Sequence, residues 1–334
     1  MKPPFTLSNA MLNKVVEISK VIGNLEFQIE RDLKLRKANR IRSIHSSLAI
    51  ENNSLTIAQI TDIIDGKRVL GDPKEIQEVK NAYDAYEEIL TFDPYKQKSF
   101  LKAHGLLTNE VVSEAGRYRS KDVGIFDSSG SVVHMGARPQ FIGTLMDELF
   151  TWGATDDTPE IIKSCVFHYE IETIHPFEDG NGRMGRLWQT VILANWNPIF
   201  AWIPIETMIY ENQEEYYKVL AIADLQNDSD VFIDFMLDTI LKSLIACKSS
   251  DKPSDKMSAK FEVKLPPELT GTETQVYLLL RKYLLTHKEI TTAIATKLVK
   301  KSASTVRKHM ATLVALGLLE AHGSNRNRVY SLKK

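Results

Sequence analysis

Residues 175–186 gather the side chains in this sequence that are best suited to chemistry. The segment reads His-Pro-Phe-Glu-Asp-Gly-Asn-Gly-Arg-Met-Gly-Arg. Pro176 should end the preceding helix at or before His175, because the α conformation is disfavoured for the residue before a proline. An imidazole is then presented at a helix end. Gly180 and Gly182 allow positive φ angles, so the backbone N–H groups around them can turn inward towards an anion.

The same segment carries charges that suit a polyphosphate. A new helix is predicted to begin near Arg183 and to continue to Trp196, so its first N–H groups and its dipole face the loop. Arg183 and Arg186 lie on neighbouring positions of that helix and offer two guanidinium groups. Asp179 supplies one carboxylate, which suits Mg²⁺ that keeps most of its ligands from water and substrate. Each feature alone is most often structural, but together they predict a polyphosphate site with a base beside it.

The segment resembles the signature of the Fic family, His-Pro-Phe-x-(Asp/Glu)-Gly-Asn-Gly-Arg-x-x-Arg, at every defined position. That family folds as a helical bundle with a β-hairpin flap, and its usual activity is transfer of AMP from ATP to a protein hydroxyl. The resemblance implies that His175 is the general base and that Asp179 holds Mg²⁺ on the phosphates. The residues it implies for ATP and phosphate binding are Asp179, Gly180, Asn181, Gly182, Arg183, Met184, Gly185 and Arg186.

Residues 46–53, Ser-Ser-Leu-Ala-Ile-Glu-Asn-Asn, resemble a second Fic signature, (Ser/Thr)-x-x-x-Glu-(Gly/Asn), which lies on an inhibitory helix. Ser47 and Glu51 share a helix face, and Asn52 completes the motif. A buried Glu needs a cationic partner, and in the family that partner corresponds to Arg186. The resemblance therefore implies autoinhibition, with Glu51 competing against the γ-phosphate for Arg186. A solvent-exposed Glu is the plain alternative, and in some relatives this Glu also aligns water to remove AMP.

A β-hairpin is predicted where residues 123–125 and 131–134 flank Asp-Ser-Ser-Gly. It resembles the family's flap, whose strand edge pins the target peptide by main-chain pairing. Val132, Val133 and His134 are the residues expected at that edge. An ordinary surface hairpin would give the same pattern.

The resemblance also places residues beside the adenine and ribose. Tyr216 and Tyr217 stand where relatives have a Tyr pair. Asp224 stands where Asn is frequent, and Gln213 where Arg is common. These two departures leave the nucleotide preference open.

The elements that must position these residues are predicted to be mainly helical. Helical spacing of apolar residues runs through most of the first 90 residues and returns in later segments. The later predicted helices cover residues 73–90, 98–112, from 141 onward, 159–174, 183–196, 212–224 and 230–247. The predicted fold class is therefore mainly α, a Fic helical bundle with a β-hairpin flap.

The C-terminal part differs from the rest in charge and pattern. Residues 261–334 carry 13 Lys and Arg against 5 Asp and Glu, whereas the remainder is acidic. Helices over 272–285, 290–298 and 303–316, followed by strands near 318–320 and 328–331, predict a winged helix-turn-helix domain. The expected domains are residues 1–95 (N-terminal helices with the inhibitory motif), 96–247 (Fic catalytic core), 248–260 (a polar linker) and 261–334 (the winged helix-turn-helix).

Such a domain suggests contact with DNA. Ser304, Thr305, Arg307 and Lys308 begin a helix whose polar and basic side chains can reach a major groove. Arg326 and Arg328 could contact phosphates from the wing. A winged helix equally serves as a protein-docking or dimer module, so this partner stays open.

Composition limits the class of protein. The 334 residues are 43% hydrophobic and 25% charged, with 16 Gly and 12 Pro, which excludes collagen-like and low-complexity chains. No apolar run approaches ~18 residues and no secretory signal follows Met1, so a cytoplasmic protein without a membrane partner is expected. Cys165 and Cys247 stand in apolar helical contexts and are expected to be reduced.

Three functional hypotheses follow. The intact His175, Asp179 and Arg186 favour a Mg²⁺-dependent protein adenylyltransferase that uses ATP and modifies a protein Ser, Thr or Tyr hydroxyl. A DNA-binding regulator whose Fic body senses nucleotide would need only the phosphate-binding loop. A Fic enzyme that uses another donor or removes AMP is the third. Homodimerisation is common in the family and is expected here.

Overall fold

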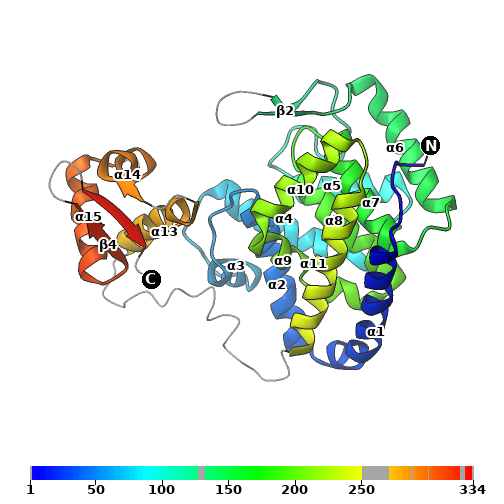
Figure 1. Ribbon diagram of the computed structural model, residues 1–334, viewed down its shortest axis with the longest axis horizontal. Coiled ribbons are helices and arrows are strands. Elements are labelled where there is room, and N and C mark those ends of the chain that lie inside the picture. The colour runs from blue at the N-terminus through cyan, green and yellow to red at the C-terminus, as the bar shows by residue number, and fades with distance from the viewer. Residues whose placement is uncertain are drawn as a thin grey trace. The chain divides into compact units, whose positions relative to one another are not determined.

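Two units make up this chain, Met1–Asp251 and Lys252–Lys334, and each is described by itself. The computed structural model describes residues 2–126, 132–249, 271–286, 289–299, 301–323 and 328–332. The predicted mainly α-helical fold is confirmed (Figure 1). The helices of the first unit are α1 (Asn9–Arg31), α2 (Leu33–Ile50), α3 (Ile57–Ile64), α4 (Pro73–Glu87), η1 (Ile89–Thr91), α5 (Gln97–Thr108), α6 (Pro139–Thr155), α7 (Glu160–Ile174), α8 (Asn181–Trp196), η2 (Pro198–Trp202), α9 (Ile205–Glu211), α10 (Gln213–Gln226) and α11 (Asp230–Ser249).

Helices α7 and α8 flank the loop of residues 175–180 in sequence and lie side by side (Figure 1). Residues 161–169 of α7 are all buried, as is typical of a central helix. Helix α8 can approach α7 closely because a Cβ at Gly185 would lie 2.7 Å from Cδ2 of His168. Trp188 of α8 is fully buried and packs edge-on against Phe100, with ring centroids 5.0 Å apart. The loop therefore joins two tightly packed helices.

Helix α2 packs against α4 and α9 and also contacts α8. Neither η2 nor α9 was predicted from the sequence, yet α9 supplies an anchor for α2. Glu206 of α9 is buried, and its carboxylate accepts hydrogen bonds from Ser43 Oγ of α2 at 2.9 Å and Tyr86 OH of α4 at 2.6 Å. Because a buried carboxylate is stable only when its hydrogen bonds are made, Glu206 holds these helices together.

The predicted hairpin is present as β1 (Gly124–Phe126) and β2 (Val132–Met135). The two strands pair antiparallel, with Gly124 opposite Met135, and the register shifts after Ile125. The predicted turn, residues 127–130, lies outside the described residues. Within the described residues these strands form a two-stranded sheet, so each strand has an outer edge.

The second unit contains α13 (Gly271–Thr286), β3 (Ile290–Thr291), α14 (Thr292–Val299), α15 (Ala303–Ala315), β4 (Leu319–His322) and β5 (Val329–Leu332). Its three-stranded sheet has the order β3-β5-β4. A helix had been predicted from Ile290, but Ile290 instead pairs with Tyr330 of β5, and α14 begins two residues later. The β-branched Ile290 and Thr291 favour the strand. Residues 250–260 of the predicted linker and residues 324–327 near the predicted turn lie outside the described part.

Two expectations from composition can be compared with the structure. Cys165 is buried and Cys247 partly buried, and neither forms a disulfide. Among the described residues, no helix combines the length and the hydropathy needed to cross a membrane.

A buried neutral histidine, His104, supports the loop. The ring of His104 stacks on Phe177 at a centroid distance of 3.6 Å. Its Nδ1 accepts from the backbone N–H of Gly116 at 2.9 Å, so the neutral ring carries its proton on Nε2 and donates to the carbonyl of Asp179 at 3.0 Å. Burial lowers the pKa of His104 to about 4. Burial likewise lowers the pKa of His45 to about 4 and of His168 to about 3.

Because the pKa values of these histidines are lowered by folding, we expect the folded protein to lose stability in mild acid. In the unfolded chain they bind protons near pH ~6.5, whereas in the folded chain they stay neutral down to their lowered pKa values. Stability is therefore complete above pH 6.5 and falls as the pH drops towards 4, by up to about 1.4 kcal/mol per pH unit for each histidine. Tryptophan fluorescence during urea unfolding can measure this for the first unit, since all 4 Trp residues lie there.

The variant His104→Gln isolates one of the three contributions. It should be less stable than wild type at pH 7, because the stacked ring and the acceptor for Gly116 N–H are removed. Between pH 6.5 and 4.5 its stability should fall less steeply, by up to about 1.4 kcal/mol per pH unit. If the free energy of unfolding fell equally steeply with pH in wild type and His104→Gln, the prediction would be wrong, because folding would then not lower the pKa of His104.

Candidate active site

His175 lies directly after the last residue of α7, as predicted, with the left-handed φ of 54°. Its ring is partly buried, and Nδ1 lies 3.2 Å from the carbonyl oxygen of Glu172. A carbonyl can only accept, so Nδ1 carries the proton and the lone pair of the neutral ring is on Nε2. The imidazole at this helix end is therefore oriented as a base. A positive φ at a residue with a Cβ is uncommon and persists only where surrounding contacts hold it.

Arg119 provides such contacts, a role that was not predicted for it from the sequence. It is buried, and its Nε donates to the carbonyl of His175 at 2.7 Å. The same guanidinium donates to the carbonyl of Lys121 at 2.6 Å and to that of Ala137, next to the hairpin. Arg119 thus ties the backbone of His175 to both ends of the hairpin. No spacing rule links residue 119 to residue 175, so only the fold identifies this role.

The loop after His175 is closed by Asn181. This side chain is buried, and its Oδ1 accepts from Phe177 N–H at 2.9 Å while its Nδ2 donates to the Phe177 carbonyl at 2.9 Å. Both ends of the Asn181 amide are therefore used within the loop. Gly180 has the predicted positive φ, at 86°.

Gly182 does not have the positive φ that was expected of it, because it already belongs to the first turn of α8. It serves a different need for a small residue. A Cβ there would lie 2.5 Å from Oε1 of Glu51 and 3.1 Å from Nη1 of Arg186. Gly182 therefore leaves room for the Glu51 carboxylate over the start of α8.

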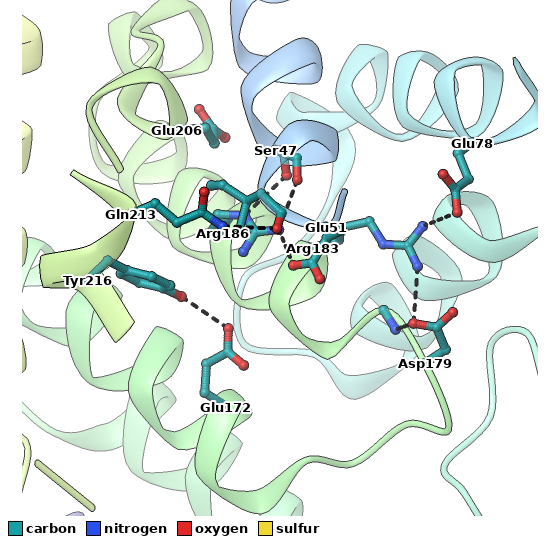
Figure 2. Close-up of polar contacts among 12 residues, drawn as sticks. Ser47, Glu51, Glu78, Glu172, Asp179, Arg183, Arg186, Glu206, Gln213 and Tyr216 are labelled. Carbon is teal, nitrogen blue, oxygen red and sulfur yellow. Dashed lines mark hydrogen bonds and ion pairs between the residues drawn. The ribbon is translucent and has the colours of Figure 1, made fainter. Parts of the chain in front are cut away.

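Arg186 is brought together with Ser47 of α2 and with Glu51, the residue directly after α2, as Figure 2 shows. The Nη2 group of Arg186 donates to Glu51 Oε1 at 2.7 Å and to the Ser47 carbonyl at 3.1 Å, while Nε donates to Ser47 Oγ at 3.2 Å. A cation at the last turn of α2 also suits the dipole of that helix. Burial opposes the charged form of Arg186, but neighbouring negative charge, chiefly that of Glu51, outweighs it and raises the pKa of Arg186.

One expectation about this pair was wrong. Glu51 was expected to be the buried partner, but its side chain is 38% exposed, whereas that of Arg186 is 1% exposed. Glu51 follows the last residue of α2, where the chain turns away through Asn52 in a left-handed conformation with φ 69°. The group that needs a counter-charge is therefore Arg186.

Asp179 and Arg183 meet on the other side of the loop. Asp179 Oδ1 accepts from Gly180 N–H at 2.6 Å and lies 3.3 Å from Nη2 of Arg183. Half of the Asp179 side chain is exposed, so it can reach solvent or a ligand. Met184 is buried and Gly185 abuts α7, so neither contributes a side chain to the loop.

The donor set fits a magnesium ion that arrives with phosphates. No group of three or more His, Cys, Asp or Glu side chains that could hold a metal by itself occurs in the part of the chain that the structure describes. Asp179 offers a single, half-exposed carboxylate. Mg²⁺ is usually coordinated by one or two protein carboxylates, with phosphate oxygens and water as its other ligands, so one carboxylate is sufficient here.

The two tyrosines of α10 differ in environment. Tyr216 is fully buried, and its hydroxyl lies 3.0 Å from His168 Nε2 and 3.1 Å from Glu172 Oε1 (Figure 2). Tyr217 is 47% exposed, so it has ring surface that a base could contact. Gln213 donates to the carbonyl of Ile50 at 3.1 Å, which joins α10 to the end of α2. Asp224 is exposed seven residues beyond Tyr217, on the same face of α10.

The remaining predicted residues belong to β2 and to the second unit. Val132, Val133 and His134 form the backbone of β2. In the second unit, Ser304, Thr305, Arg307 and Lys308 occupy the first turns of α15, where Ser302 caps the helix by accepting from Thr305 N–H at 3.2 Å. Ser304, Arg307 and Lys308 are exposed, as is Arg328 before β5, and Arg326 lies outside the described residues.

Comparison with known proteins agrees with this geometry. Residues 94–193 match the sequence model of the Fic/DOC family. The chain is 29% identical over 210 residues to a protein adenylyltransferase Fic of Nematostella vectensis, covering 58% of this chain and 45% of that protein. It is 25% identical over 235 residues to the protein adenylyltransferase fic-1 of Caenorhabditis elegans, covering 66% and 43% respectively. The chain thus spans less than half the length of these two relatives.

A solved structure extends the similarity along the whole chain. The crystal structure of a Fic family protein from Desulfovibrio desulfuricans is 37% identical, covers 99% of this chain and 98% of its own, and superimposes with a TM-score of 0.72. Sequence identity at this level over nearly all of both chains, together with the intact loop, shows that the chain belongs to the Fic family.

Proposed function

We propose that this protein is a Mg²⁺-dependent protein adenylyltransferase, which transfers AMP from ATP to a Ser, Thr or Tyr hydroxyl of a target protein. The observation that carries the proposal is the orientation of His175. Its Nδ1 proton is directed at the Glu172 carbonyl, so Nε2 is the basic nitrogen of this ring, which stands six residues before the first residue of α8. The names of the relatives support the same activity at the level of the family.

The reaction follows from the parts of the loop. The target hydroxyl gives its proton to Nε2 of His175 as its oxygen attacks the α-phosphorus of ATP. The bond from the α-phosphorus to the bridging oxygen breaks, pyrophosphate leaves, and AMP stays esterified to the target. The first N–H groups of α8 and the guanidinium of Arg183 stabilise the developing charge on the phosphates. Fixed positions matter most in such phosphoryl chemistry, and Asn181 and Arg119 hold the loop in place.

Asp179 is the residue that would hold Mg²⁺. When bound, the ion supplies positive charge to the phosphate oxygens and fixes their orientation. On the nucleotide side, Tyr217 and Asp224 offer exposed groups for the base and ribose, and the buried ring of Tyr216 lies against that of Tyr217 with centroids 5.3 Å apart. The outer edge of β2, which includes Val132, Val133 and His134, pairs with no other strand among the described residues and offers its main-chain groups to an extended target segment.

The same enzyme is proposed to inhibit itself through Glu51. The γ-phosphate and the Glu51 carboxylate are both anions that suit the buried guanidinium of Arg186. While Glu51 holds Arg186, the triphosphate cannot take its productive position. Release of the end of α2 would exchange one anion for the other.

Intact-mass spectrometry after incubation with ATP and Mg²⁺ tests the transfer and the inhibition together. The variant Glu51→Gly should modify itself with AMP at least about tenfold more than wild type, which corresponds to about 1.4 kcal/mol of barrier. Adding His175→Ala to Glu51→Gly should reduce the modification by about 10²- to 10⁴-fold, because the general base is removed. Chelation of Mg²⁺ should abolish the modification as well.

Three results of this experiment would count against the proposal. Equal modification of wild type and Glu51→Gly would remove the inhibitory role of Glu51. Modification that persists in the His175→Ala variant would remove the assigned base and leave adventitious chemistry. A variant that binds ATP but gains no AMP would favour a different donor or a nucleotide sensor.

A second candidate function is favoured by the exposed basic residues of the second unit. Arg307 and Lys308 project from the first turns of α15, and Arg328 is exposed before β5. Residues 261–334 carry 13 Lys and Arg against 5 Asp and Glu, so an acidic partner is expected. We propose that this unit binds DNA with α15 in the major groove.

Fluorescence anisotropy with a labelled random-sequence DNA duplex tests this candidate. Binding should weaken as salt rises, and Arg307→Ala/Lys308→Ala should lower the slope of log affinity against log salt by about two, because each side chain neutralises one DNA phosphate. Lys218→Ala, a change at an exposed lysine of the first unit, is the control and should leave the slope unchanged. Wild-type binding weaker than about 10⁻⁴ M at physiological salt would instead favour a protein-docking role.

A further inference from the structure

Glu78 of α4 contacts Arg183 in the first turn of α8, from a helix that the proposed reaction does not use. Its Oε1 lies 3.6 Å from Nη1 of Arg183 (Figure 2). The Arg183 side chain is 5% exposed and that of Glu78 is 13% exposed, so water screens this ion pair weakly. Nε of Arg183 is buried and has no hydrogen-bond partner among the described residues. Arg183 is therefore a buried cation whose donors are only partly used.

The second oxygen of Glu78 binds the chain just beyond Glu51. Oε2 accepts from Nδ2 of Asn53 at 2.9 Å, and the same amide also donates to the carbonyl of Glu75 at 3.2 Å. Glu75, one turn earlier on α4, accepts from the N–H and the hydroxyl of Ser54 at 2.7 and 2.8 Å. The carboxylates of Glu75 and Glu78 thus fix the turn that follows the end of α2. Among the described residues, Glu78 also pairs with Arg183, whereas Glu75 does not.

The loop arginines are therefore each paired with a glutamate from the N-terminal helical region. Glu51 lies at the end of α2 and holds Arg186, and Glu78 lies on α4 and holds Arg183. The two glutamates are linked, because Asn53 stands two residues after Glu51 and donates to Glu78. Asp179 also pairs with Arg183, but it is half exposed and is assigned to the metal.

We infer that Glu78 is a second inhibitory carboxylate, which competes with the β- and γ-phosphates for Arg183 while it keeps the turn after Glu51 in place. This inference rests on the proposed function, in that Arg183 is taken to bind ATP phosphates. A phosphate oxygen that bonds to Arg183 must either displace Glu78 or share the guanidinium with it, and two anions on one buried cation repel each other. The competition lowers the affinity for ATP in the resting protein.

The variant Glu78→Gln tests the inference with little change in shape. The glutamine oxygen can still accept from Asn53, so the turn keeps its bond, but the negative charge beside Arg183 is gone. Isothermal titration of the full chain with ATP and Mg²⁺ should show about three- to tenfold tighter binding than wild type, which matches the size of a single charge contact. In an Arg183→Ala background the same substitution should change the affinity less than about twofold.

Glu75→Gln is the matched control. Glu75 lies on the same helix, and its substitution weakens the bonds of the same turn to Ser54 without changing the charge that pairs with Arg183. The affinity for ATP should therefore stay within about twofold of wild type. An equal gain in both single variants would overturn the inference, since a loosened turn alone would then explain it. An unchanged or weaker affinity in Glu78→Gln would also overturn it and make Glu78 a residue that positions Arg183 for binding.

Failure of the inference about Glu78 can be distinguished from failure of the proposed transfer reaction. If Glu51→Gly binds ATP without acquiring AMP, the transfer reaction fails while the Glu78 affinity test still applies. If Glu51→Gly modifies itself but Glu78→Gln gains no affinity, the reaction stands and the inference about Glu78 is wrong. Thermal unfolding of each variant beforehand excludes loss of fold as the cause of a weaker affinity.

Discussion

The buried guanidinium of Arg186 is the constraint on which the rest of the site depends. Its side chain is 1% exposed, so its charge cannot be compensated by water and must be met by protein or ligand. In this structure Ser47 and Glu51 supply the acceptors. Because Glu51 is more than one third exposed, water screens its side of the pair, and the carboxylate can leave at a lower cost than a fully buried one. The inhibitory contact proposed here must be strong enough to form and weak enough to be exchanged, and this asymmetry is compatible with both requirements.

The surrounding fold keeps that exchange local. Gly182 leaves space for the Glu51 carboxylate directly over the first turn of α8. Asn181 and His104 hold the loop backbone through bonds to Phe177, Gly116 and Asp179, all of which lie outside α2. Arg119 fixes the backbone of His175 in the same way. His175 and the loop backbone are therefore supported independently of the groups assigned to inhibition, and movement of the end of α2 need not disturb the base.

Sequence reasoning could find those parts of the site whose signals are local. The helix end at His175, the turn at Gly180 and the arginine spacing all follow from a few adjacent residues, and the Glu51–Arg186 pair followed from family resemblance. Contacts between distant residues carried no such signal: Arg119, His104 and Glu78 reach the loop from separate helices or turns. The prediction that Glu51 is buried was wrong, because the sequence did not show that α2 ends at Ile50, just before it. In the second unit, the short strand at Ile290 was missed because its pairing partner, Tyr330, lies far along the chain.

The central claim, that Glu51 and the γ-phosphate compete for Arg186, is tested most directly by comparing ATP with ADP. Calorimetric affinities for both nucleotides in the presence of Mg²⁺ should be similar in wild type, because Glu51 blocks the contact that distinguishes them. In Glu51→Gly, ATP should bind at least about tenfold more tightly than ADP, because the γ-phosphate then forms a charge-assisted contact with Arg186 that ADP cannot form. An equal ATP preference in wild type and Glu51→Gly would contradict the competition and, with it, the inhibitory role of Glu51.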